Sequence, residues 1–484
     1  MIKSIIDKYK AIPVQIKASF WFLICAFLQR GISLITTPVF TRLLSTAEYG
    51  QYSVFNSWLS IVTVFVSLNL YSGVYVQGLV KFEDNKKAFA SSLQGLCLTL
   101  VAVWMVVYLL FQDFWNGLFE LTTVQMLAML IMIWTSSVFS FWSVEQRVNS
   151  KYQILVLVTL LVSLIKPILG ILLVIYAEDK VTARILGILL VEMVAYTPFF
   201  FLQMRRGKQF YSGKFWKYAL GFNIPLLPHY LSMTVLNSAD RIMIGRMVGE
   251  SEAGIYNLAY SISMIMMMFN TALMQTIEPW LYRKIKEKKV ADISKVAYPA
   301  FLLIAGVNIM LMFFAPEVIK MFAPVEYADA IWIIPPVAMS VFFMFLYTFF
   351  AVFEFYYEKT KYITLATMIG AVVNILLNAI FIDIFGYYAA GYTTLVCYML
   401  FTLFHYCFMK KLCKIHLENA QVYNERILLI IVVSFLFMGF MCLFTYQNIY
   451  VRYSLVLLFG FIAFIFRKKI IQGVLGILNI KEKK

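Results

Sequence analysis

The chain has 484 residues, of which 62% are hydrophobic and only 14% are charged. A soluble globular domain is about half apolar and about a quarter charged, so this composition excludes a soluble body of this size. The net charge of +16 favours loops on the cytoplasmic side of a membrane over nucleic-acid binding.

Apolar runs of about 20 residues recur along the chain, and each can cross a hydrocarbon core about 30 Å thick. Backbone groups within lipid must be hydrogen-bonded inside their own segment, so these runs are expected to be helices. The sequence therefore predicts an all-α polytopic membrane protein with about 14 transmembrane helices. The expected spans are roughly 18–40, 52–76, 88–111, 120–142, 153–176, 184–204, 217–239, 254–277, 296–315, 328–352, 362–382, 387–408, 427–445 and 450–466.

Lysine and arginine alternate sharply between the loops on the two sides of these spans. Of the 41 Lys and Arg, 32 fall on the side of the two termini and 7 on the other side, while Arg30 and Lys166 lie inside spans. Loops that remain in the cytoplasm carry the excess of Lys and Arg. We therefore expect both termini in the cytoplasm and a multi-pass chain in a bacterial inner membrane.

Both ends of the chain place apolar residues between lysines. Ile2, Ile5 and Ile6 show this pattern, and it returns after Arg467. Such segments are expected to lie along the membrane surface and to need no function beyond anchoring.

The chain contains an internal repeat. Residues 42–52 and 246–256 share the pattern R-x5-E-x-G-x-Y at an offset of 204, and Gly187 matches Gly391 at the same offset. Each repeat carries six expected helices, and an even number gives both repeats the same orientation, with a pseudo-two-fold axis along the membrane normal. Parallel repeats are typical of transporters whose substrate site lies between the halves. The predicted domains are a six-helix lobe at 1–205, a second six-helix lobe at 206–415, and two further helices with a basic cytoplasmic tail at 416–484.

Three groups of residues carry a family resemblance. Thr37, Pro38 and residues 42–52 follow the first expected span, and Asp240-Arg241, Gly249 and residues 254–256 follow the seventh. Lys359 to Tyr362, Asn374, Asn378 and residues 385–394 cover the eleventh and twelfth. In order and spacing, these residues resemble the Wzx-type polysaccharide repeat-unit flippases of the MOP superfamily. The chain departs from that family at Thr46, often a proline, and at Tyr387 and Tyr388, usually small residues.

The resemblance implies two six-helix lobes around a central cavity that opens alternately to each membrane face. It implies an undecaprenyl-diphosphate-linked oligosaccharide, such as an O-antigen or capsule repeat unit, as the cargo moved to the outer leaflet. Other partners would be membrane lipids and polysaccharide-assembly proteins, and no nucleic acid. The resemblance implies transport without ATP, and the sequence has no G-x4-GK[ST] loop to hold a nucleotide. We expect no enzymatic activity, catalytic residue or bound cofactor.

Two basic residues are the candidate ligands for the diphosphate. Arg30 lies in the middle of the first expected span and Lys166 in the middle of the fifth. Charges at membrane depth are costly and rarely face lipid, and arginine and lysine are both suited to phosphate. The alternatives are an ion pair with Glu192 of the sixth span, or snorkelling of the side chain to an interface.

Other polar residues are weaker candidates. Arg42, Glu192, His229 and Arg241 are expected to line the cavity or the lobe interface. A coupling cation, Na⁺ or H⁺, is expected at Asp240, Asn374, Asn378 and Thr394, because oxygen atoms suit a hard cation. Asn374 and Asn378 lie four residues apart, hence on one helix face. The alternative is hydrogen bonding between helices. No other metal site is expected.

Rivals from two classes remain open, an exporter and a membrane enzyme. A multidrug or toxin exporter of the same superfamily would usually stop at twelve helices and favour acidic residues in its first lobe. A membrane polysaccharide polymerase would need a large external loop, and a sugar-nucleotide transferase would need an acidic motif such as D-x-D. The sequence shows neither feature.

Overall fold

The computed structural model describes residues 13–468 and residue 472, and these residues form helices and connecting turns with no β-strand among them. They divide into two compact units between Thr234 and Val235. We call residues up to Thr234 unit 1 and residues from Val235 unit 2. The surface segments expected around Ile2 and after Arg467 lie almost entirely outside the described residues.

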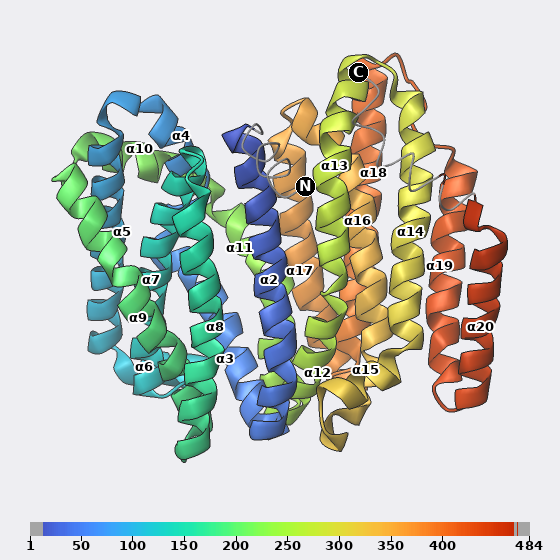
Figure 1. Cartoon of the computed structure of the whole chain (residues 1–484), viewed down its shortest axis with the longest axis horizontal. Helices are drawn as coiled ribbons and strands as arrows, with labels where there is room; N and C mark the ends of the chain where they lie inside the picture. Colours follow the sequence, from blue (N-terminus) through green and yellow to red (C-terminus); the bar gives the residue numbers. More distant parts are fainter. Residues whose placement is uncertain (1–12, 469–471, 473–484) are drawn as a thin grey trace, which may run out of the picture. The chain divides into compact units, whose positions relative to one another are not determined.

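Unit 1 is built from six long helices and several short ones, labelled in Figure 1. Its helices are α2 (Val14–Leu43), α3 (Thr46–Ser67), α4 (Gly73–Lys81), α5 (Lys86–Leu110), α6 (Gln112–Phe119), α7 (Thr123–Val148), α8 (Tyr152–Tyr176), α9 (Lys180–Gly207) and α10 (Gly213–Asn223). The first part of α11 (Leu227–Met247) also belongs to unit 1, and its remainder opens unit 2.

Unit 2 continues with α12 (Glu250–Ser263), α13 (Met266–Lys286), α14 (Ile293–Phe313), α15 (Ala315–Phe322), α16 (Ile334–Tyr356), α17 (Thr360–Phe385), α18 (Ala389–His416), α19 (Glu425–Thr445) and α20 (Ile449–Ile465). A 3₁₀ segment, Val325–Trp332, joins α15 to α16. The last two long helices, α19 and α20, pack on each other and against α14.

The predicted all-helical membrane fold is confirmed. Each of the fourteen expected spans falls on described helices, the second on α3 and α4, the seventh on α10 and α11, and the eighth on α12 and α13. Eleven segments of the described chain are long and apolar enough to cross a membrane. The expected spans outside those eleven correspond to α3, α11 and α20. The α20 helix is shorter, with 17 residues, whereas α3 and α11 contain more polar residues.

The division of the units falls inside α11, about thirty residues after the lobe boundary expected between 205 and 206. Contacts with unit 1 explain this position. The Asn223 side chain, at the end of α10, donates hydrogen bonds to the carbonyl oxygens of Leu68 and Asn69, at 2.8 and 2.9 Å. The Trp216 indole donates to the Ser92 carbonyl at 2.9 Å. These bonds hold α10 against the end of α3 and against α5.

The repeated sequence pattern marks equivalent helix starts. Ser45 caps α3, accepting a hydrogen bond from the Glu48 backbone, while the Glu48 carboxylate accepts one from the Ser45 backbone at 2.7 Å. In the second copy, Gly249 is the N-cap of α12 and Glu252 lies in its first turn. The arginine that opens each copy lies in the last turn of the preceding helix. The pattern therefore encodes the same connection twice, with a carboxylate placed favourably near a helix N-terminus.

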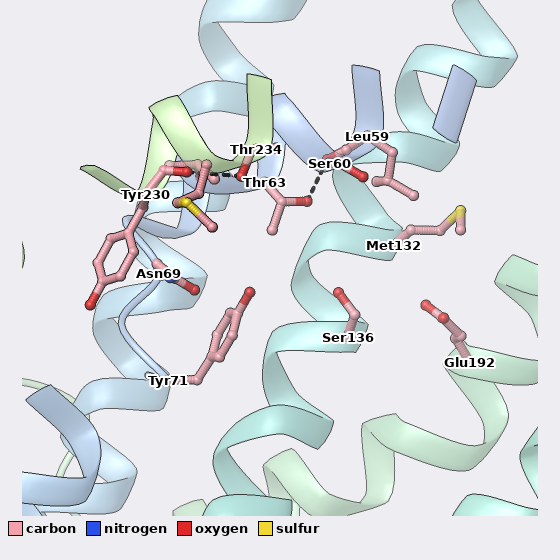
Figure 2. Close-up of a pocket in the computed structure, with 12 residues that line it drawn as sticks. Leu59, Ser60, Thr63, Asn69, Tyr71, Met132, Ser136, Glu192, Tyr230 and Thr234 are labelled. Atoms are coloured by element: carbon pink, nitrogen blue, oxygen red, sulfur yellow. Dashed lines mark hydrogen bonds between the residues drawn. The ribbon is translucent and has the colours of Figure 1, made fainter. Parts of the chain in front are cut away.

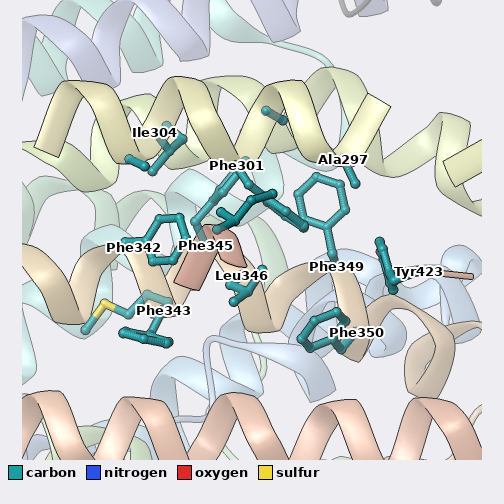
Figure 3. Close-up of a cluster of buried hydrophobic side chains, with 14 of the residues drawn as sticks. Ala297, Phe301, Ile304, Phe342, Phe343, Phe345, Leu346, Phe349, Phe350 and Tyr423 are labelled. Carbon is teal, nitrogen blue, oxygen red and sulfur yellow. The ribbon is translucent and has the colours of Figure 1, made fainter. Parts of the chain in front are cut away.

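The core of unit 2 surrounds α16. Nearly every residue of this helix is apolar and buried, as expected for a helix packed on all sides. Phe301 of α14 meets Phe349 of α16 edge to face, with ring centroids 4.8 Å apart, and Phe349 lies 5.2 Å from Phe345 (Figure 3). Aromatic pairs in this arrangement add about 0.5–1.5 kcal/mol beyond area burial. The packed phenylalanines make α16 the central helix of unit 2.

Candidate functional site

Unit 1 contains a cavity of about 520 Å³ lined by α3, α7, α9, α11 and the turn after α3. Figure 2 shows the side chains around it. Most carry oxygen or nitrogen atoms, and these polar lining residues are Ser60, Thr63, Asn69, Tyr71, Ser136, Glu192, Tyr230 and Thr234. The volume lies within the range typical of small-molecule sites, about 300–1,000 Å³.

The cavity explains why two helices are unusually polar for their length. Ser60 and Thr63 lie one turn apart on α3, and Tyr230 and Thr234 lie one turn apart on α11. Residues three or four apart share one face of a helix. Polar side chains within membrane proteins face the protein interior or a water-filled space rather than lipid. The polar faces of α3 and α11 therefore belong to the cavity wall.

An ion pair closes one side of the cavity. Lys166 Nζ on α8 lies 2.6 Å from Glu192 Oε1 on α9, and the Thr135 hydroxyl donates to Glu192 Oε2 at 3.0 Å. The Glu192 side chain is only 7% exposed. The Lys166 ammonium also lies 5.5 Å from the centre of the Tyr196 ring. Of the two basic residues inside the expected spans, Arg30 and Lys166, it is Lys166 that forms the ion pair with Glu192.

Arg30 has a different environment. It lies on α2 with an exposed side chain, and within the described part of the chain no residue forms an ion pair or hydrogen bond with it. Its neighbour Gln29 donates a hydrogen bond to the Ser163 hydroxyl at 3.1 Å, which ties α2 to α8. An uncompensated arginine in a membrane span is costly unless water or a ligand solvates it.

The remaining sequence candidates of unit 1 lie nearer the helix ends. Arg42 Nη1 donates to the Pro38 carbonyl at 2.8 Å, in the last turn of α2. His229 lies on α11 beside Tyr230, with ring centroids 5.9 Å apart, and Tyr230 rather than His229 lines the cavity. Neither Arg42 nor His229 is among the residues that line this cavity.

Unit 2 brings the candidate cation ligands together. Asp240 is fully buried on α11, and its Oδ1 accepts a hydrogen bond from Asn378 Nδ2 at 2.6 Å. Its Oδ2 accepts from the Tyr256 hydroxyl at 2.7 Å and from the Thr394 hydroxyl at 3.0 Å. Helices α11, α12, α17 and α18 thus meet at one carboxylate. Tyr256 was not among the sequence candidates, although it ends the second copy of the repeated pattern.

Asn374 completes this cluster. Its Oδ1 lies 3.4 Å from Asn378 Nδ2, while its own Nδ2 is buried without a hydrogen-bond partner. The Thr393 hydroxyl donates to Asn378 Oδ1. In this structure the Asp240 carboxylate accepts three hydrogen bonds from α12, α17 and α18. The cluster thus shows the hydrogen bonding between helices that is the alternative to a cation site.

Arg241 follows Asp240 in the chain but lies outside this cluster. Its Nε donates to Asn257 Oδ1 at 3.0 Å, and its guanidinium stacks 4.0 Å above the centre of the Tyr260 ring. Stacking of this kind suits arginine more than lysine. In unit 2, Arg241 therefore joins α11 to α12.

An apolar groove of about 1,280 Å³ lies between α14, α19 and α20. Leu302 and Met310 contribute from α14, Ile430 and Met438 from α19, and Phe461 from α20. Ser434 is the only side chain with a hydroxyl among its lining residues. A groove of this volume with an almost wholly apolar lining suits a hydrocarbon chain.

Comparisons with known proteins agree with this architecture. The family model described as "Polysaccharide biosynthesis protein" matches residues 16–284, more than half of the chain, and a model described as "MatE" matches residues 225–380. The chain is 28% identical over 215 residues to "Lsg locus putative protein 1" of Haemophilus influenzae. The matched region makes up 41% of this chain and 52% of that protein. The chain thus matches about half the length of this curated relative. An "Uncharacterized membrane protein" of the same organism is 22% identical over 380 residues, covering 74% of this chain and 88% of that protein.

Two solved structures share the fold. The structure titled "Lipid II flippase MurJ, inward closed conformation" matches with a TM-score of 0.67 at 15% identity, covering 92% of this chain and 99% of that one. An inward-facing multidrug resistance MATE family transporter of the MOP superfamily matches with a TM-score of 0.59 at 14% identity, covering 80% and 96%. At these identities the likeness concerns the fold alone. The family match over residues 16–284 shows that the chain belongs to the polysaccharide biosynthesis protein family.

Proposed function

We propose that this chain is a flippase that moves an undecaprenyl-diphosphate-linked oligosaccharide from the cytoplasmic to the outer leaflet of a bacterial inner membrane. The observation that carries the proposal is the polar cavity in unit 1, which is lined in part by α7 and α9, two helices long and apolar enough to cross a membrane. A polar sugar cannot cross hydrocarbon unless its hydrogen bonds to water are replaced. The wall of this cavity supplies such replacement groups.

The cargo has an oligosaccharide, a diphosphate and a lipid tail, and the two units offer a matching chemistry for each. The hydroxyl-rich cavity of unit 1 suits sugar. Arg30, without a protein partner among the described residues, suits the diphosphate because a guanidinium makes two-point contacts with phosphate oxygens. The apolar groove along α14, α19 and α20 suits the polyprenyl tail.

The Asp240 cluster is proposed to bind the coupling ion, Na⁺ or H⁺. Asp240 would supply the negative charge, while Asn374, Asn378 and Thr394 would supply uncharged oxygens. Because the carboxylate joins α11 to α12, α17 and α18, ion binding there changes the hydrogen bonds among four helices. Binding of an ion to one conformation more tightly than to another shifts the population between them.

A multidrug exporter is the second candidate, and two observations favour it. The match to the MatE model covers residues 225–380, and a carboxylate, Glu192, lines the cavity. However, Lys166 already neutralises that carboxylate at 2.6 Å. A cationic drug would have to displace an ammonium group of the same chain, so we favour the sugar cargo.

Deletion of the gene in its own host tests the proposed function. The proposal predicts that sugar-loaded carrier lipid accumulates on the cytoplasmic leaflet, that surface polysaccharide is lost, and that the native chain restores both. Unchanged surface polysaccharide together with increased sensitivity to cationic drugs would instead support the multidrug exporter.

A further inference from the structure

The serine and threonine hydroxyl groups that line the unit 1 cavity each donate their proton to a backbone carbonyl of their own helix. Ser60, Thr63, Ser136 and Thr234 each donate a hydrogen bond to the carbonyl of the residue three or four positions earlier in the same helix, at 2.8, 2.6, 3.3 and 2.9 Å. Figure 2 marks two of these bonds, from Thr63 and from Thr234. A hydroxyl has one proton and two lone pairs. These four groups therefore offer the cavity hydrogen-bond acceptors.

The charge in the cavity wall is also an acceptor. Glu192 is the only charged residue among the lining residues. Its carboxylate forms an ion pair with Lys166, which does not line the cavity. Lysine and arginine are missing from the lining. The wall is thus close to neutral and rich in acceptors.

Two phenols and one amide add the donors. The Tyr230 hydroxyl accepts a hydrogen bond from the Ser72 hydroxyl at 3.2 Å, which leaves its own proton for another partner. Tyr71 and Asn69 lie in the turn after α3 and also line the cavity. Figure 2 shows the Tyr71 side chain extending into the open space near Ser136. Tyrosine rings also supply flat apolar faces.

From this pattern we infer that the unit 1 cavity binds an uncharged sugar of the cargo and excludes its diphosphate, an inference that rests on the proposed function. Sugar hydroxyls both donate and accept, so they can satisfy the acceptor-rich wall and the two phenols. A diphosphate has only acceptor oxygens at neutral pH and needs cations or several N–H donors. Against this wall its charge would be desolvated without compensation, which strongly disfavours binding there.

Unit 1 then has two subsites, one for the sugar and one for the diphosphate. The sugar lies against Thr63, Ser136 and Thr234, whereas the diphosphate remains outside the cavity, where Arg30 is the span cation without a partner in the described chain. Sugar and phosphate contacts should therefore be separable by mutation.

Cysteine protection tests this assignment on the full-length protein in lipid nanodiscs. A Ser136→Cys variant is prepared in a background where the six native cysteines are replaced by alanine, and its reaction rate with a small maleimide is measured. The probes are sugar-loaded carrier lipid purified from the host, undecaprenyl diphosphate without sugar, and tetraphenylphosphonium as a lipophilic cation. The cysteine-free parent is the matched control for background labelling.

We expect sugar-loaded lipid to slow labelling of Ser136→Cys strongly, while undecaprenyl diphosphate at the same concentration leaves the rate unchanged. Equal protection by undecaprenyl diphosphate, or protection by the phosphonium cation alone, would overturn the assignment. Absence of protection by any probe would also overturn it, provided that the same variant restores surface polysaccharide. If the native chain itself fails to restore polysaccharide, the proposed function fails instead.

A pair of substitutions removes acceptors without changing size. Thr63→Val and Thr234→Val each delete one lining hydroxyl, and loss of one good hydrogen bond corresponds to about tenfold in affinity. We expect each variant to bind sugar-loaded lipid about tenfold more weakly, with unchanged binding of undecaprenyl diphosphate. Weaker binding of both lipids to the same degree would show a structural role and contradict the subsite.

Discussion

At the residue scale, the pairing of Lys166 with Glu192 separates two cations that looked alike in the sequence. Both Arg30 and Lys166 were candidate phosphate ligands, and Glu192 was a candidate partner for either. The partner could not be chosen from sequence, because the choice depends on how α8 packs against α9. The 2.6 Å contact uses the Lys166 charge within the protein and leaves Arg30 for other partners.

Lys166→Ala is expected to destabilise the fold, because it leaves the nearly buried Glu192 carboxylate without its counter-ion. Removal of one partner of a buried ion pair costs about 3–5 kcal/mol, and the partial exposure of Lys166 places the effect at the lower end. Thermal unfolding of the detergent-purified protein measures it. The double variant Lys166→Met/Glu192→Met should recover most of the lost stability, and a double variant no better than the single one would contradict the ion-pair account.

Arg30 is expected to act in transport rather than in stability. Arg30→Ala should impair polysaccharide export at a normal membrane level, because the phosphate loses its positive partner. Arg30→Lys should restore only part, since an ammonium cannot make the planar two-point contact, and Arg30→Glu should be worst. Export is measured as surface polysaccharide per unit of inserted protein. Normal export by Arg30→Glu would remove Arg30 from the phosphate site.

Asp240→Asn tests the ion cluster with a side chain of the same size. The asparagine side chain can still form hydrogen bonds that join the four helices of the cluster, so the amount of protein in the membrane should change little. Without the carboxylate charge, transport in proteoliposomes should no longer respond to an imposed Na⁺ or H⁺ gradient. Tyr256→Phe removes one donor but keeps the charge, and it should retain the response. An unchanged response in Asp240→Asn would exclude this cluster as the coupling site.

At the scale of elements, the sequence predicts the helices well but predicts the cavity poorly. Long apolar runs identify spans because lipid leaves few alternatives to a helix. The cavity depends instead on single polar side chains, and their only signal in the sequence is the helical spacing of Ser60 with Thr63 on α3 and of Tyr230 with Thr234 on α11. The break between α12 and α13 is also missed, because residues 264 and 265 are apolar and carry no proline or glycine.

Gly187 and Gly391, which match each other in the repeat, both lie where two helices pack closely. A side chain at Gly187 of α9 would meet the Gly170 backbone of α8 at 3.0 Å, and one at the matching Gly391 of α18 would meet Pro336 of α16 at 3.1 Å. Small residues allow membrane helices to approach closely. Both glycines therefore permit a close helix contact, the first with the preceding helix α8 and the second with α16, two helices before α18.

Gly187→Val is expected to separate α8 from α9 and thereby disturb the Lys166–Glu192 pair. Overpacking of this kind costs about 1–3 kcal/mol. The melting temperature of the purified variant should fall. Gly221→Val on α10 is the control, since a side chain there meets nothing within 4 Å. An equal loss in both variants would point to helix propensity rather than to close packing.

At the scale of the whole molecule, the helix order and the distribution of basic loops predict the topology. An alkaline phosphatase fusion after Gln112, between the third and fourth expected spans, should be active because that loop is expected outside the cytoplasm. A fusion after Lys484 should be inactive. The reverse pattern of activities would contradict the predicted orientation.

The central claim concerns the movement of a lipid-linked sugar, and a reconstituted assay tests it most directly. The purified chain is placed in liposomes that contain sugar-loaded carrier lipid from the host, and periodate oxidises sugars exposed on the outer leaflet. The account predicts that carrier from the inner leaflet becomes oxidised over time with the native chain, and only slowly with Arg30→Glu at equal protein density. Oxidation limited to the outer leaflet, with an ion gradient applied and the native chain correctly folded, would contradict it.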